Sequence, residues 1–309
     1  MNSFALGEGA KATADNAIAM GLNAQATGVS SIALGAKSRA QNSGFAAGGA
    51  NCVGVASFAC GGNTFVQGNS SVGIGHSNIT NGVQSATFGL GATNMGSRSF
   101  AFGITDVKTY TYTTTRPTAR TAIIAADVTP ALTEEIAKQF LACFPEGWTT
   151  PAIVKSVVKN EDGTYAVTFV YDVAVTNTKL TFRCGQGIHN NVTGSVLFGN
   201  GTILSSNSFL VGNGIVEAKY GAGIGQNLLV TGENQFVTGK SNIPLQDMAF
   251  IIGNGVEARS NALTVDWNGN LKAAGSVETT SVILSSPNGT KFKVTVDDDG
   301  ILTSTEITE

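Results

Sequence analysis

A five-residue pattern of serine, large apolar, small, large apolar and glycine recurs through the first third of the chain. Its large and small residues alternate with a period of two, which predicts a β-strand with two different faces. The copies recur every 13 or 14 residues, a regularity that identifies a repeat architecture. We expect the closing glycines to form turns with positive φ, and they are Gly7, Gly21, Gly35, Gly48, Gly61, Gly75, Gly89 and Gly103.

Most copies carry a second glycine about seven residues after the first, as at Gly28, Gly54 and Gly68. Two turns in each repeat predict two short strands per coil. Successive coils then stack about 4.8 Å apart, as neighbouring strands do. The predicted fold is therefore mainly β, with parallel β-roll or β-solenoid arrays, and residues 1–103 form a β-roll of eight coils.

The two faces of the predicted strand differ in size. We expect the large residues to form the core of the repeats: Phe4, Leu6, Ile18, Met20, Ile32, Leu34, Phe58, Cys60, Val72, Ile74, Phe100 and Phe102. The opposite face is mostly alanine, which suggests that another backbone lies close to it. Since one coil buries little apolar surface, we expect stacking and a lateral partner on the alanine stripe to stabilise the roll.

The repeated signature resembles the head repeats of the YadA-like trimeric adhesins. Ser31-Ile32-Ala33-Leu34-Gly35 carries the resemblance, together with alanine-rich positions such as those of 21–28. The heads of that family are left-handed parallel β-rolls assembled as trimers. The resemblance therefore implies a homotrimeric fibre, whereas periodicity alone implies only a β-solenoid.

A looser array of the same kind occupies residues 189–270. Its copies include 195–199, 208–212, 235–239, 249–253 and 262–266. The middle position is often Leu, Val or Ile, so both strand faces are apolar. We expect a wider core or a tighter contact between chains in this array.

Residues 104–188 interrupt the repeat and are predicted to be a small inserted α+β domain. Leu132, Ile136, Phe140 and Phe144 recur every four residues, which predicts an amphipathic helix that starts near Thr129-Pro130 and ends at Pro145. Strands are expected at 107–115, 153–158, 165–175 and 180–184. Residues 160–163 are expected to form a hairpin turn between two of them.

The C-terminal β segment, residues 271–309, has a residue pattern that differs from those of both arrays and of the insertion. Together with 261–270, it resembles the ends of bacteriophage and prophage fibre proteins, in stretches such as 285–296 and the turn 297–300. This second resemblance lies in the general residue pattern and not in a fixed repeated motif.

Composition narrows the possible partners. Charged residues are 13% of the chain and the net charge is −3, which gives no basic patch for nucleic acid. No apolar run reaches about 18 residues, so we expect no membrane insertion. The N-terminus lacks a basic region followed by an apolar run, so no signal peptide is expected.

No group of residues predicts catalysis, a cofactor or a metal. The first array holds only two acids, Glu8 and Asp15, half a coil apart, whereas a glycosidase needs two facing carboxylates. Two histidines, His76 and His189, support no nucleophilic triad. The four cysteines have no metal-ligand spacing, and we expect reduced, buried thiols.

The sequence thus favours a non-enzymatic structural fibre. The first interpretation is a phage virion fibre, on head or tail, located in the virion. Its partners are its own copies, other virion proteins and a host cell-surface glycan or protein. The alternative is the passenger segment of a bacterial trimeric autotransporter adhesin, at the bacterial cell surface; a polysaccharide-degrading tailspike is the least favoured. We expect residues 104–188 to project as three lateral knobs in the trimer. They either carry the receptor contacts or act as a spacer or a lock of the trimer.

Overall fold

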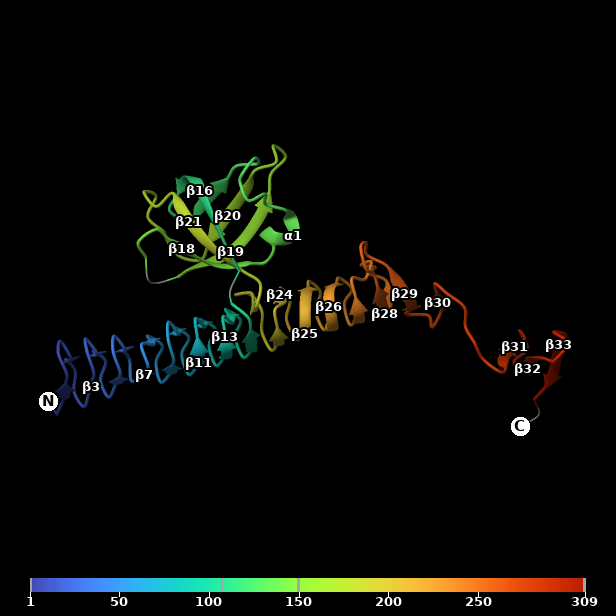
Figure 1. Ribbon diagram of the computed structural model, residues 1–309, viewed down its shortest axis with the longest axis horizontal. Helices are drawn as coiled ribbons and strands as arrows, with labels where there is room; N and C mark the ends of the chain where they lie inside the picture. Colours follow the sequence, from blue (N-terminus) through green and yellow to red (C-terminus); the bar gives the residue numbers. More distant parts are fainter. Residues whose placement is uncertain (1, 107, 149–150, 308–309) are drawn as a thin grey trace.

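A computed structural model describes residues 2–106, 108–148 and 151–307. The chain forms a straight stack of β-coils with one barrel beside it and a small sheet at the C-terminal end (Figure 1). The protein is nearly all β, and its main body is a parallel β-solenoid, which confirms the predicted fold class.

Each coil has a longer and a shorter strand, and each strand pairs in parallel with its counterpart in the next coil. The longer strands of the first array are β1 (Phe4–Leu6), β3 (Ile18–Met20), β5 (Ile32–Leu34), β7 (Phe45–Ala47), β9 (Phe58–Cys60), β11 (Val72–His76), β13 (Ala86–Leu90) and β15 (Phe100–Ile104). The shorter ones are β2 (Lys11–Ala12), β4 (Gln25–Ala26), β6 (Arg39–Ala40), β8 (Asn51–Cys52), β10 (Phe65–Val66), β12 (Ile79–Thr80) and β14 (Thr93–Asn94).

The interior of the first array is made mostly of alanine, so the strand faces are the reverse of the prediction. Ala19, Ala33, Ala46 and Ala59 are completely buried between the two strands of their own coils. The backbone that lies close to the alanine stripe therefore belongs to the same chain. Two strands joined by tight turns leave room only for small side chains, and the large ones point outward.

The closing glycines let the turns stack directly on one another. Gly61 has a φ of 107°, and a Cβ added there would come within 1.8 Å of the carbonyl oxygen of Gly75. Of the eight predicted turn glycines, all but Gly103 have a positive φ.

The stack continues through the insertion without a break. β14 pairs with β22 (Gly187–Ile188), and β15 pairs with β23 (Val196–Gly199). The serines that open the signature form a ladder that also crosses this point, since the Ser195 amide donates to Ser99 Oγ at 3.2 Å. The insertion therefore interrupts a single coil. The chain leaves this coil after residue 104 and rejoins it at 186–187.

The insertion is a closed barrel of six strands rather than an α+β domain. Its strands are β16 (Lys108–Thr118), β17 (Thr121–Ile124), β18 (Phe140–Pro145), β19 (Ala152–Lys159), β20 (Tyr165–Phe169) and β21 (Lys179–Cys184). The predicted long helix is wrong: α1 covers only Glu134–Ala137, capped by Thr133. Position 107 lies outside the described residues.

The error has a physical cause in β18. Phe140 and Cys143 pack into the barrel core, whereas Ala142 and Phe144 pack against the coil stack. Both faces of this strand are therefore apolar. The resulting spacing of four between Phe140 and Phe144 resembles that of a helix.

The second array has larger strands and a larger interior. It continues through β24 (Thr202–Ile203), β25 (Phe209–Val216), β26 (Ala222–Val230), β27 (Phe236–Lys240) and β28 (Met248–Asn254). Leu197, Leu210, Val237 and Ile251 occupy the interior positions that alanine holds in the first array.

The parallel array ends earlier than the sequence suggests. β29 (Asn261–Asp266) pairs antiparallel with β28 and then with β30 (Leu271–Ala273), so 262–266 is not another coil. A separate antiparallel sheet follows, made of β31 (Val282–Ser285), β32 (Lys291–Val296) and β33 (Leu302–Glu306). No helix in the described residues has the length and hydrophobicity of a membrane span.

Candidate functional site

An apolar ribbon runs along the outer side of the longer strands. Two columns of side chains in register form it, and we call them together the outer ribbon. The first column is Phe4, Ile18, Ile32, Phe45, Phe58, Val72, Ala86, Phe100, Val196, Phe209, Ala222, Phe236 and Phe250. The second is Leu6, Met20, Leu34, Ala47, Cys60, Ile74, Phe88, Phe102, Phe198, Val211, Ile224, Thr238 and Ile252. Neither column contains a charged residue.

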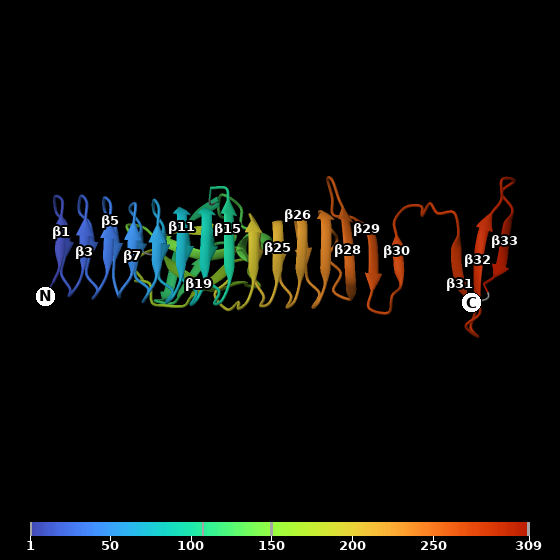
Figure 2. The ribbon, with the colours of Figure 1, turned by 90° about the horizontal axis from the view of Figure 1, so that it is seen from below.

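All twelve residues predicted to be the core of the repeats lie on the outer ribbon. Within one chain they are only partly covered: Leu6 is 56% exposed, Ile74 37% and Phe102 38%. Aromatic rings stack along the ribbon, as in Phe45 on Phe58, with ring centroids 4.8 Å apart. Figure 2 shows the longer strands side by side on one face, with the barrel behind them.

The barrel is seated on the other face, over the shorter strands. Their outward column is polar at Lys11, Gln25, Arg39 and Asn51, and then becomes apolar at Phe65 and Ile79. Those two residues pack with barrel residues Ala142 and Ile153 in one buried cluster. The change of residue type in this column therefore marks where the barrel rests.

Ion pairs hold the barrel to the second array as well. Lys138 Nζ lies 2.8 Å from Glu217 Oε1, and Arg259 Nη2 lies 3.4 Å from Glu135 Oε1. The partners are exposed or partly exposed, so each pair contributes little stability by itself. Together with the apolar seat, they fix the orientation of the barrel on the stack.

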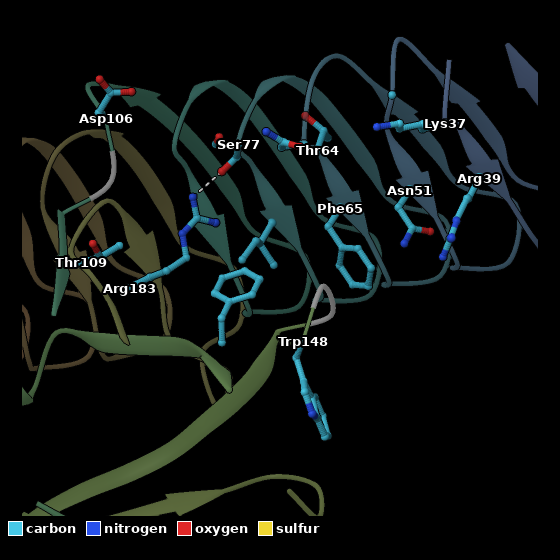
Figure 3. A pocket seen from close by; sticks show the side chains of 14 residues that line it. Lys37, Arg39, Asn51, Thr64, Phe65, Ser77, Asp106, Thr109, Trp148 and Arg183 are labelled. Atoms are coloured by element: carbon cyan, nitrogen blue, oxygen red, sulfur yellow. Dashed lines mark hydrogen bonds between the residues drawn. The ribbon is translucent and has the colours of Figure 1, made fainter. Parts of the chain in front are cut away.

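A cleft of about 640 Å³ opens between the first array and the barrel (Figure 3). The stack provides its polar wall, with Lys37, Arg39, Asn51, Asn63 and Thr64. The apolar part is made by Phe65, Ile79 and Phe144, with Trp148 on the barrel side. Asp106 is the one carboxylate among the described residues that line it.

Arg183 is the most unusual residue of this cleft. Its side chain comes from barrel strand β21 and is only 6% exposed. It donates a hydrogen bond from Nη2 to the backbone carbonyl of Ser77 in the stack, drawn as a dashed line in Figure 3. Burial lowers the pKa of Arg183 to about 10, so the guanidinium is still charged at neutral pH.

The other candidate groups from the sequence are spread over the molecule. His76 is exposed at the end of β11 and its Nδ1 lies 3.0 Å from Ser77 Oγ, whereas His189 lies beyond the insertion. Cys52, Cys143 and Cys184 are buried and Cys60 is partly buried on the outer ribbon; all four are free thiols. In the described parts of the chain, no three His, Cys, Asp or Glu side chains form a metal-binding group.

Two acidic segments, 266–270 and the predicted turn 297–300, form tight turns closed by aspartate side chains. Asp266 Oδ1 accepts from the amides of Asn268 and Asn270, both at 2.9 Å. Asp297 Oδ1 accepts from the amides of Asp299 and Ile301 in the same way.

Sequence reasoning missed the cleft because its residues come from segments far apart in the chain. Arg39 and Arg183 face the same cleft although many coils and the barrel separate them in sequence. The one signal in the sequence is the change from Asn51 to Phe65 in the outward column of the shorter strands.

The N-terminal coils are YadA-like head repeats. The family model of the YadA head domain repeat matches residues 1–24, 16–38 and 26–44. These matches cover the first coils of the stack and agree with the two-stranded coil found there. No curated protein matches the chain.

Proposed function

We propose that this protein is a non-enzymatic, homotrimeric attachment fibre whose chains meet along their outer ribbons. The observation that carries the proposal is the outer ribbon itself, an uncharged apolar surface that continues in register through both arrays. Contiguous apolar surface of this kind on a water-soluble protein is typical of an interaction site.

A second copy of the same chain is the occupant that fits this surface. The side chains of the ribbon repeat at the coil spacing of about 4.8 Å. The ribbon of a second copy has the same spacing from one end to the other, so the two ribbons match. The absence of charge from the ribbon disfavours a charged partner. The trimeric state follows the likeness of the N-terminal coils to YadA head repeats.

The C-terminal sheet supports assembly in the same way. Ile283, Leu284, Val296 and Leu302 are all more than half exposed in the single chain. A three-stranded sheet with so little buried surface is marginal by itself. Packing of three such sheets around the fibre axis would cover these side chains.

We propose two alternatives for the particle or cell that carries the fibre. We favour a phage virion fibre, on head or tail, because the C-terminal segment resembles the ends of such fibres. The alternative is a trimeric adhesin passenger on a bacterial surface, which the YadA head repeats favour. In both, the role is attachment to a cell-surface glycan or protein, with no contact to nucleic acid and no insertion into a membrane.

Light scattering on the purified protein tests assembly. At micromolar concentration the mass should be about three times the chain mass of 31.6 kDa, and a monomer would contradict the proposal. Gold-labelled antibodies against the barrel, viewed in the electron microscope, then show where the fibre is located. Label on phage particles supports the virion fibre, and label on bacterial cells supports the adhesin. Labelled particles that fail to bind any cell would contradict the attachment role.

A further inference from the structure

The cleft between the barrel and the first array has the composition of a binding site rather than of a packing defect. It combines apolar side chains from Phe65, Ile79 and Phe144 with convergent polar groups. Its volume lies within the range of about 300–1,000 Å³ that is common for small-ligand sites. The barrel is held on both sides, by the apolar seat and by Lys138–Glu217, so the cleft is preformed.

The charge of the cleft is positive, with three cations against one carboxylate. Lys37, Arg39 and Arg183 face it with the single carboxylate of Asp106, and the described residues contain no ion pair for any of the three cations. A guanidinium has five N–H donors, and Arg183 uses one for the Ser77 carbonyl. A buried cation without an anionic partner is costly, so an anion in the cleft would lower the free energy of this site.

The remaining polar groups favour a ligand that carries hydroxyls. Asn51 Oδ1 is buried and has no hydrogen-bond partner in the described structure, and it can accept from a hydroxyl group. Asn63 and Thr64 add amide and hydroxyl groups nearby. Three cations are few for a nucleic-acid backbone, which proteins usually hold with about 6–10 phosphate contacts.

The cleft is also open at one end toward a polar track. Arg39 at its edge continues in register to Gln25 and Lys11 on the preceding coils. A linear polymer could leave the cleft along these side chains. The barrel lies on the side of the stack opposite the longer strands (Figures 1 and 2). Chains that meet along their outer ribbons would therefore leave the track on the shorter strands free.

We propose that this cleft binds an acidic saccharide, whose carboxylate or sulfate pairs with the guanidinium groups while its hydroxyls bond to the amide and hydroxyl side chains. The proposal rests on the attachment role above and names the chemical class of its receptor. A chain that forms trimers and binds cells without binding acidic sugars would contradict this inference alone.

Binding of the full-length protein to defined probes tests the proposal by calorimetry. The acidic probes are oligogalacturonate, heparin oligosaccharide and sialyllactose. Methyl-esterified oligogalacturonate, lactose and inorganic phosphate serve as controls. We expect at least one acidic sugar to bind and its neutral counterpart to bind at least tenfold more weakly, since the neutral form lacks the charge-assisted hydrogen bonds to the guanidinium groups. Binding of no acidic sugar, equal binding of the neutral forms, or binding of phosphate alone would overturn it.

Variants then locate the site. Arg39→Gln should weaken binding about tenfold or more, and Asn51→Asp should weaken it through repulsion of the anion with almost no change in size. Lys219→Gln, an exposed cation of the second array, is the matched control and should bind like the native protein. Arg183 is buried, so Arg183→Met is informative only if it folds, and Arg39→Gln and Asn51→Asp decide. Native affinity in both would place the site elsewhere and overturn the assignment.

Discussion

The barrel and the first array are both built from β-strands, but they bury apolar surface in different places. The barrel encloses Tyr110, Tyr112, Phe140, Phe169 and Phe182 in one core within a single chain. The first array encloses little more than alanine methyl groups, and its large side chains lie on the outer ribbon. Burial of a large apolar side chain is worth about 1.5–3 kcal/mol. The barrel gains this within the chain, whereas the array would gain it in full only through the proposed assembly along the outer ribbon.

The second array lies between these two cases. Its interior holds Leu197, Leu210 and Ile251 at 0% exposure, while Phe198 and Ile224 on its outer ribbon are about 40% exposed. It therefore has a core of its own and an apolar outer surface as well. The comparison teaches that the large residues of a repeat signature need not form the interior of the coil.

Phe58→Asp should have the largest effect, because it acts on the surface that is proposed to join the chains. The trimer would bury three unpaired carboxylates, each at a cost of several kcal/mol. We expect light scattering to show loss of the trimeric mass, together with a large fall in the thermal midpoint. Gln25→Asp, on the outward column of a shorter strand, is the control. An unchanged mass and midpoint in Phe58→Asp would show that the outer ribbon is not the chain interface.

Phe182→Ala should have a large effect that is confined to the barrel. The ring is fully buried and stacks on Phe140 with centroids 4.6 Å apart. Removing it should destabilise the barrel by about 3–5 kcal/mol, measured by denaturant unfolding followed through tyrosine fluorescence. The trimeric mass should not change. Dissociation of this variant would show that the barrel, rather than the ribbon, holds the chains together.

The smallest effect should come from pH, through His189 at the junction where the chain returns from the barrel to the stack. Burial lowers the pKa of His189 below its ordinary value of 6.5, so the unfolded chain binds this proton more readily than the folded one. Stability should therefore fall as the pH drops below about 6.5. His189→Gln should remove this part of the pH dependence in thermal melts. An identical pH profile in the variant would exclude His189 as its source.

Local sequence determined the coils. Apart from the two pairings that cross the insertion, each parallel pairing of the first array joins equivalent positions one repeat apart. A period of 13 or 14 residues is therefore enough to predict its parallel strands in register. The resemblance to YadA head repeats rested on the same local signature. The hairpin at 160–163 was also predictable, because its turn lies between two strands that are adjacent in the chain.

Only the tertiary structure decided which face of each strand is inside, how the insertion folds and where the cleft lies. Alternation reports two faces but does not say which one is enclosed, and here the distance between two strands of one coil admits alanine and excludes phenylalanine. β18 contacts the barrel core on one face and the stack on the other, so its sequence has no strand-like alternation. The cleft joins Arg39 to Arg183 because the barrel docks on Phe65 and Ile79, and such long-range packing leaves no periodic signal along the chain.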